Sequence, residues 1–182
     1  MSNTEQDESE LDRVMVDIET LGLERGAAII SIGACRFSPR IGWERDEFYT
    51  EISIESNQAH GLHVDPETME WWEQQDADLA PLDGDADLDV ALEDFRAWLG
   101  EPDELWANSP KFDMSMLEAG YEAIGSDVPW AYYQLRDVRT VRNLPGAVEL
   151  QMHGDEHHAL DDARHQADEI AEMLNQVGVL AE

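Results

Sequence analysis

The apolar positions of the amino-terminal third of the chain fall into three short runs that are typical of β-strands. The first run covers residues 14–19 and leads into Thr20-Leu21-Gly22, the second covers residues 27–37, and the third, reached through a polar turn at residues 40–46, covers residues 48–52. The first run shows no clear alternation, as in a strand buried on both faces. We therefore expect three consecutive strands in a meander.

The rest of the chain alternates helical patterns with short strand patterns. Asp65 precedes a proline at the first helical position, which is typical of a helix start. Four apolar residues between Asp87 and Leu99 recur at helical spacing. The predicted elements are a helix at 66–75, a helix at 87–99, a strand at 104–107, a helix from 111 to 119 or beyond, a short strand within 130–138, a helix beginning at Arg136, and a helix from His157 to about Val177.

Length and composition indicate one globular domain. The chain has 182 residues, of which 42% are hydrophobic, enough for a sizeable core. We assign residues 13–182 to a single domain and residues 1–12 to an acidic, disordered tail. The sequence has no run of 18 apolar residues and no basic-then-apolar start, so we expect no membrane span, no signal peptide and a cytoplasmic protein. Cys35, the single cysteine, lies in an apolar run and is expected in the core.

The charge is strongly negative. Asp and Glu number 42 against 11 Lys and Arg, a formal net charge of −31, and Lys111 is the one lysine. Such a protein avoids polyanions, mimics one, or works in molar salt, where the Debye length is only about 3 Å. The acid is spread over the whole chain, which favours the third interpretation, an adaptation to high salt.

The first strand pattern ends in two carboxylates separated by one residue. Residues i and i+2 of a strand share a face, so Asp17 and Glu19 should project together. Like charges this close are costly unless a cation lies between them, and Mg²⁺ prefers oxygen ligands. A solvated sheet edge is the plain alternative, but an apolar strand buried on both faces argues against it. We interpret the pair as half of a Mg²⁺ or Mn²⁺ site.

Two further positions extend this candidate site. Asp113 lies at a predicted strand-to-helix junction, in the first turn of its helix. If His157 lies before the last helix and Asp162 within its first two turns, the imidazole can fold over the carboxylate's site. One group would then hold metal and the other would handle a proton.

Two clusters have both a structural and a functional interpretation. Trp71 and Trp72 either pack their helix on the domain, which we favour, or form a stacking wall for a nucleobase. The arginines at 136, 139 and 142 form a local basic group in an acidic chain. They either contact phosphate or pair with nearby carboxylates, and both interpretations stay open.

Together these motifs resemble the DEDD superfamily of 3′-5′ exonucleases, in its histidine-bearing DEDDh subclass. Residues 17–20 resemble the first motif, residues 108–113 the second, and His157-x-Ala159-Leu160-x-Asp162-Ala163 the third. The resemblance implies an α/β, RNase H-like fold with a mixed central sheet flanked by helices. It also implies two divalent ions, Mg²⁺ or Mn²⁺, with Asp17, Glu19, Asp113 and Asp162 as metal ligands and His157 as general base.

The Trp71-Trp72-x-x-Gln75 and Arg136-Asp137-x-Arg139-Thr140 segments resemble a small exoribonuclease-like branch found in bacteria and phages. Several small relatives are dimeric, so a homodimer is one option for this chain. The expected partner is the 3′ end of single-stranded RNA or DNA, and the sequence does not choose between the sugars. The candidate substrate-binding residues are Thr20, Leu21, Gly22, Trp72 and Lys111, with Leu21 offering an apolar face to the base and Lys111 standing where the branch usually has a small residue.

Two rival functions remain. A chain of this charge can be a catalytically inactive acidic nucleic-acid mimic or interaction protein on the same fold, although such a protein has no need of His157 and four ligand positions. A junction-resolving endonuclease would share acidic residues at the sheet edge but would lack the pairing of His157 with Asp162. We favour the exonuclease.

Overall fold

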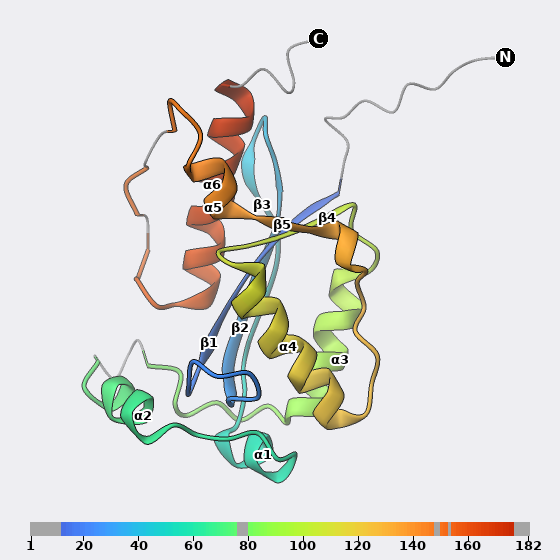
Figure 1. Ribbon diagram of the computed structural model, residues 1–182, viewed down its shortest axis with the longest axis vertical. Helices are drawn as coiled ribbons and strands as arrows, with labels where there is room; N and C mark the ends of the chain where they lie inside the picture. The colour runs from blue at the N-terminus through green and yellow to red at the C-terminus, as the bar shows by residue number, and fades with distance from the viewer. Residues whose placement is uncertain (1–11, 76–79, 148–149, 153, 177–182) are drawn as a thin grey trace, which may run out of the picture.

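Five strands form one mixed sheet in the order β3-β2-β1-β4-β5 (Figure 1). β1 (Arg13–Thr20) pairs antiparallel with β2 (Ile29–Ser38), and β2 pairs antiparallel with β3 (Gly42–Glu51). On its other edge β1 pairs parallel with β4 (Glu104–Ala107), and β4 pairs parallel with β5 (Leu135–Asp137). The expected three-strand meander is confirmed.

The computed structural model describes residues 12–75, 80–147, 150–152 and 154–176. Its helices are α1 (Ile54–Ala59), α2 (Pro66–Glu73), α3 (Leu88–Leu99), α4 (Pro110–Ile124), α5 (Val138–Arg142) and α6 (Ala159–Gln176), with a 3₁₀ turn, η2 (Tyr132–Gln134), before β5. Residues 1–11 of the tail expected at 1–12, and the expected helix end at Val177, lie outside these residues, whereas Asp12 is described and accepts a hydrogen bond from Arg36. No helix in the described segments is both long and apolar enough to cross a membrane.

The alternation along β1 decides which side chains reach which face of the sheet. Val14, Val16 and Ile18 pack with α3 and α4, whereas Met15 packs with α6. Figure 1 shows α3 and α4 on one side of the strands and α6 on the other. Because successive side chains alternate, Asp17 and Glu19 project on the same side as Met15, toward α6.

Two local predictions are wrong, and one helix was not predicted. β3 begins at Gly42, so most of the expected polar turn at residues 40–46 is strand. The polar residues of this segment suggested a turn, but some of them belong to the strand and are paired with arginines. Asp46 pairs with Arg36, and the adjoining Glu47 pairs with Arg164. Arg136 lies on β5 and the helix starts later, at Val138. Helix α1 was not predicted, because six residues repeat the helical spacing too few times to be recognised.

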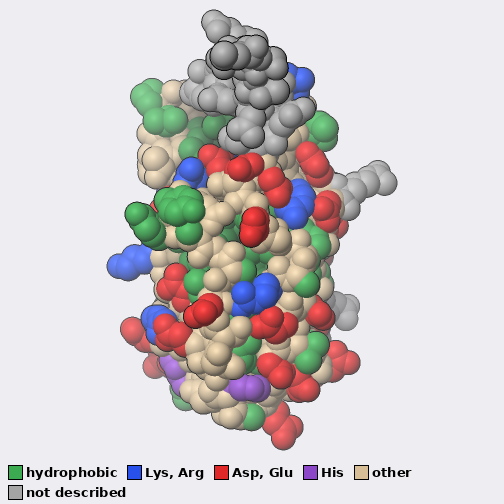
Figure 2. Space-filling view, turned by 90° about the vertical axis from the view of Figure 1, so that its right-hand side faces the viewer, with side chains coloured by type: hydrophobic (Ala, Val, Ile, Leu, Met, Phe, Trp, Pro, Cys, Tyr) green, Lys and Arg blue, Asp and Glu red, His purple; other side chains and the backbone are tan. Residues whose placement is uncertain are grey.

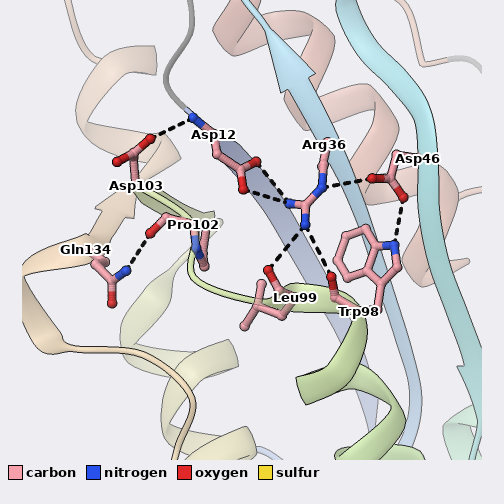
Figure 3. Close-up of polar contacts among 8 residues, drawn as sticks. All are labelled: Asp12, Arg36, Asp46, Trp98, Leu99, Pro102, Asp103 and Gln134. Atoms are coloured by element: carbon pink, nitrogen blue, oxygen red, sulfur yellow. Dashed lines mark hydrogen bonds and ion pairs between the residues drawn. The ribbon is translucent and has the colours of Figure 1, made fainter. Parts of the chain in front are cut away.

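Arg36 joins four segments at the end of the sheet where β1 begins (Figure 3). Its guanidinium donates to Asp12 at 2.9 Å, to Asp46 at 2.8 Å, and to the backbone carbonyls of Trp98 and Leu99. The Asp46 carboxylate also accepts from the Trp98 indole at 2.9 Å. One side chain therefore ties the start of β1, strands β2 and β3, and the end of α3 together, far along β1 from Asp17 and Glu19.

Candidate metal centre

Three carboxylates meet where β1 ends and α6 begins. Asp17, Glu19 and Asp162 each offer an oxygen atom, and these atoms lie within 4.8 Å of one another. The expected projection of Asp17 and Glu19 to one side of the sheet is confirmed. The three side chains come from two elements that are more than 100 residues apart in sequence, so the fold itself assembles the cluster.

Gly33 allows α6 to come close enough to bring Asp162 to the strand. Gly33 on β2 pairs directly with Asp17 on β1. A Cβ atom at Gly33 would lie 2.2 Å from the backbone of Ala159 and Leu160, at the start of α6. Because no real side chain fits in that space, the helix begins in direct contact with the strand, one turn before Asp162.

Asp113 lies in the first turn of α4, as predicted, and is 3% exposed. It is not one of the three residues whose oxygens meet, but its charge raises the pKa of both Asp17 and Glu19, so it lies near them. Its Oδ2 atom is buried and has no hydrogen-bond partner among the described residues. A buried carboxylate oxygen without a hydrogen-bond partner, on a residue whose charge acts on Asp17 and Glu19, fits a cation ligand.

Burial and mutual repulsion disfavour the charged forms of these acids. Burial first, and the neighbouring Asp17, Asp162 and Asp113 next, raise the pKa of Glu19 to about 9. The same two causes raise the pKa of Asp17 well above its ordinary value, and burial raises those of Asp113 and Asp162. A bound divalent cation would instead favour the charged forms of these carboxylates. An all-oxygen donor set of this charge fits Mg²⁺ or Mn²⁺.

We expect the metal-free protein to lose stability as the pH rises. Between its ordinary pKa of 4.5 and its folded pKa of about 9, Glu19 holds more protons in the folded chain than in the unfolded chain. Its contribution to stability is therefore fully present below 4.5 and is lost as the pH rises through about 9. Thermal denaturation in EDTA at a series of pH values should show this decline, and Mg²⁺ should oppose it most at high pH.

The matched variants are Glu19→Gln, which removes the titrating group, and Glu172→Gln at an exposed position of α6. Glu19→Gln should flatten the decline with pH, and Glu172→Gln should leave it unchanged. Equal slopes for the parent and Glu19→Gln would contradict the assignment.

His157 lies two residues before α6, which begins at Ala159 and not at His157 as expected, and it is hydrogen-bonded to Asp162. Its backbone N–H donates to the Asp162 carboxylate at 2.9 Å, and its φ of 66° is left-handed, which is uncommon outside glycine. Its ring meets the rings of Trp71 and Trp72 edge to face, with centroid distances of 5.1 and 6.3 Å. His158 points elsewhere and stacks on Tyr49 at 4.6 Å. Of the two histidines, His157 is therefore the one held between Asp162 and α2.

A cavity of about 620 Å³ adjoins the carboxylates. Its lining includes Glu19, Thr20, Leu23, Trp71, Trp72 and Phe112. Trp71 is 41% exposed and Leu23 is 80% exposed, so both present apolar surface to a ligand. The cavity therefore places an aromatic and aliphatic wall next to a carboxylate cluster, a combination that suits a nucleoside beside a phosphate.

The structure places the predicted substrate-binding residues unequally. Thr20 lines the cavity. Trp72 also lines it but is 2% exposed, and its indole donates to the Thr20 carbonyl at 3.1 Å. Leu21, expected to offer an apolar face to a base, is fully buried. Gly22 packs inward, where a Cβ would lie 3.0 Å from that of Ala27.

Lys111 is exposed at the start of α4 and makes no ion pair within the described part of the chain. The three arginines of the basic group do form ion pairs: Arg136 pairs with Glu104, Arg139 with Asp137 and Arg142 with Glu169. Each of these arginines has a carboxylate partner, although the side chains of Arg136 and Arg139 are 38% and 54% exposed. Lys111 stays available to an anionic ligand.

Gln166 was not predicted from the sequence. Its Nε2 donates to Asp17 Oδ1 at 2.9 Å, and its side chain is 5% exposed. The available signal was its position, four residues after Asp162 and thus on the same helix face. Leu23 was likewise not predicted, and Trp71 was considered only together with Trp72 as a possible stacking wall.

Comparison with known families gives one match over most of the chain. The model of the 3′-5′ exoribonuclease Rv2179c-like domain family matches residues 12–174. No curated protein sequence matches the chain at a significant level.

Several solved structures share the fold at low sequence identity. The nuclease domain of 3′hExo, a DEDDh family member bound to rAMP, is 13% identical, with a TM-score of 0.65 over 93% of this chain and 94% of that one. Cell-death related nuclease 4 is 14% identical, with a TM-score of 0.66 over 91% and 64%. E. coli exonuclease I in complex with a dA16 oligonucleotide is 11% identical, with a TM-score of 0.68 over 92% and 41%.

The last two proteins are longer than the region they share with this chain, which spans 64% of the one and 41% of the other. The likenesses establish the fold. The expected RNase H-like α/β architecture, with a mixed central sheet flanked by helices, is confirmed.

Proposed function

The chain belongs to the Rv2179c-like 3′-5′ exoribonuclease domain family, and on that premise we propose that it shortens single-stranded nucleic acid stepwise from the 3′ end in a metal-dependent reaction. The observation that carries the proposal is the meeting of Asp17, Glu19 and Asp162 within 4.8 Å, with Asp113 nearby and His157 bonded to Asp162. An inactive protein on this fold would need none of these residues together.

Asp17, Glu19, Asp113 and Asp162 would hold two Mg²⁺ or Mn²⁺ ions. When bound, such ions stabilise the charge that develops on a phosphodiester and make water nucleophilic at neutral pH. His157 would take the proton of the attacking water, since histidine is the side chain that most often acts as a general base. The backbone bond to Asp162 and the ring contacts with Trp71 and Trp72 hold the His157 side chain beside the carboxylates.

The 620 Å³ cavity would receive the 3′-terminal nucleoside. Trp71 and Leu23 would contact the base, and Lys111 would approach a phosphate of the chain. RNA is the first substrate to test because of the family's description. Among the structural neighbours, 3′hExo is bound to rAMP and exonuclease I to a DNA oligonucleotide, so DNA belongs in the same assay.

We expect Trp71→Ala to raise KM about tenfold, since stacking of one base on an aromatic ring contributes about 1–3 kcal/mol. Trp71→Phe keeps a ring and should retain most of the affinity. Initial rates against substrate concentration measure both, with Tyr132→Ala, an 87% exposed aromatic on η2, as the control. A fall in kcat with an unchanged KM would show that Trp71 only supports His157.

The deciding experiment uses single-stranded RNA and DNA labelled at the 5′ end, with Mn²⁺, Mg²⁺ or EDTA. Stepwise ladders from the 3′ end that need the metal would support the proposal and rank the two sugars. Fragments from internal cleavage would point to an endonuclease. Intact strands under every condition would overturn the proposal and favour the acidic, inactive alternative.

High salt is the second part of the proposal. Acidic side chains are scattered over the face shown in Figure 2, where they outnumber the Lys and Arg among them, and the net charge is −31. In molar KCl the Debye length falls to about 3 Å, so self-repulsion and repulsion of the substrate weaken. We expect folding and activity to persist in molar KCl and to weaken on dialysis against low salt. An activity optimum near ~0.1 M would contradict the adaptation.

A further inference from the structure

Gln166 on α6 forms a hydrogen bond with Asp17 on β1. It lies on α6 four residues after Asp162, and its amide nitrogen donates to Asp17 Oδ1 at 2.9 Å. Within the described residues no other group donates to the Asp17 side chain. The orientation of this carboxylate therefore depends on one hydrogen bond.

Packing alone does not account for a glutamine here. The side chain is 5% exposed, and Ala163, Ala167 and Ile170 around it on α6 are fully buried. Its Oε1 atom is buried with no hydrogen-bond partner in the described part of the protein. A buried, unpaired acceptor is destabilising, so an apolar side chain of similar length would suit this position at least as well if stability were its only role.

The chemistry of an amide suits a group that orients a cation ligand. A lysine or arginine at this position would neutralise Asp17 and compete with a divalent ion. A glutamine donates to one carboxylate oxygen, Oδ1, without adding charge, and this hydrogen bond does not involve the second oxygen, Oδ2. Hydrogen bonds of this kind fix the orientation of ligands in metal sites.

We propose that Gln166 is a positioning residue for divalent-cation binding, which holds the Asp17 carboxylate in the orientation that the cluster requires. The inference rests on the proposed metal-dependent function. It predicts that metal affinity and fold stability respond separately to a change at this position, which a purely structural residue would not allow.

The test compares Gln166→Met and Gln166→Glu with the parent chain. Met has nearly the same length but no polar end, and Glu has the same shape but no N–H donor when ionised. Mn²⁺ affinity, titrated by calorimetry without nucleic acid, should fall about 10- to 100-fold in both variants. The melting temperature of metal-free Gln166→Met should fall by no more than about 4 °C. Raising the Mn²⁺ concentration should restore the nuclease rate.

Gln176→Met is the matched control, because Gln176 lies on the same helix with an exposed amide that donates to Glu172 at 2.9 Å. Its Mn²⁺ affinity should equal that of the parent. Unchanged affinity in a folded Gln166→Met would overturn the inference, and if that variant does not fold, Gln166→Glu decides in its place. Lowered Mn²⁺ affinity in variants of a parent that cleaves no nucleic acid would support the role of Gln166 while refuting the proposed exonuclease.

Discussion

Asp17→Asn is expected to lower the rate of 3′-end shortening about a thousandfold or more. An oxygen of this carboxylate lies within 4.8 Å of oxygens of Glu19 and Asp162, so its loss should weaken the binding of divalent cations by the cluster. Metal ions contribute several kcal/mol of charge stabilisation in such reactions, and each 1.36 kcal/mol corresponds to about a factor of ten in rate. Single-turnover rates on a labelled oligonucleotide measure the effect.

The metal-free Asp17→Asn protein should be at least as stable as the parent, because the substitution removes a half-buried acid that repels Asp113 and Asp162. Asp94→Asn, at an exposed site on α3, is the matched control and should keep the full rate. A folded Asp17→Asn protein with more than a tenth of the parent rate would mean that the reaction takes place elsewhere.

His157→Asn should lower kcat about 100- to 10,000-fold, the usual contribution of general acid–base catalysis. Asparagine is the better replacement than alanine because it tolerates the left-handed backbone of this position. The backbone N–H that bonds Asp162 stays in place, so Mn²⁺ affinity should change little. The measurement is a pair of titrations, kcat from initial rates and Mn²⁺ affinity from calorimetry.

His158→Asn separates the two adjacent histidines. The His158 ring stacks on Tyr49, away from Trp71 and Trp72, so this variant should keep kcat within about threefold of the parent, well below the effect expected for a general base. If His158→Asn is the slow variant and His157→Asn the fast one, the assignment of the base is off by one residue.

The fold was predictable from sequence where the spacing of apolar residues reflects burial in the core alone. Strand β1 and the helices α2, α3 and α6 follow apolar spacing and capping residues, and Asp65 caps α2 as expected. The start of β3 was hidden because its polar residues are satisfied by partners distant in sequence, such as Arg36 and Arg164. The sequence alone does not reveal whether a charged side chain faces water or pairs with an opposite charge.

The site was predictable in its acids and less so in its surroundings. The convergence of Asp17, Glu19 and Asp162 is confirmed, and their roles as ligands remain predictions. Leu21 and Leu23 could not be ranked from sequence, since the direction of the chain after β1 decides that the first is buried and the second exposed. Gln166 belongs to no charge or apolar pattern, and its one sequence signal, the four-residue spacing from Asp162, does not identify Asp17 as its partner.

The close contact between Gly33 and the start of α6 also provides a rule for comparing sequences. Asp17 and Gly33 are paired neighbours in the sheet, and the start of α6 rests on Gly33. Any chain that builds its site this way needs a glycine opposite its first-strand aspartate, or a final helix that begins farther from the sheet. The absence of a side chain on a neighbouring strand is thus a diagnostic feature for distant relatives, and it can be searched for when the acidic motifs alone are too short to be informative.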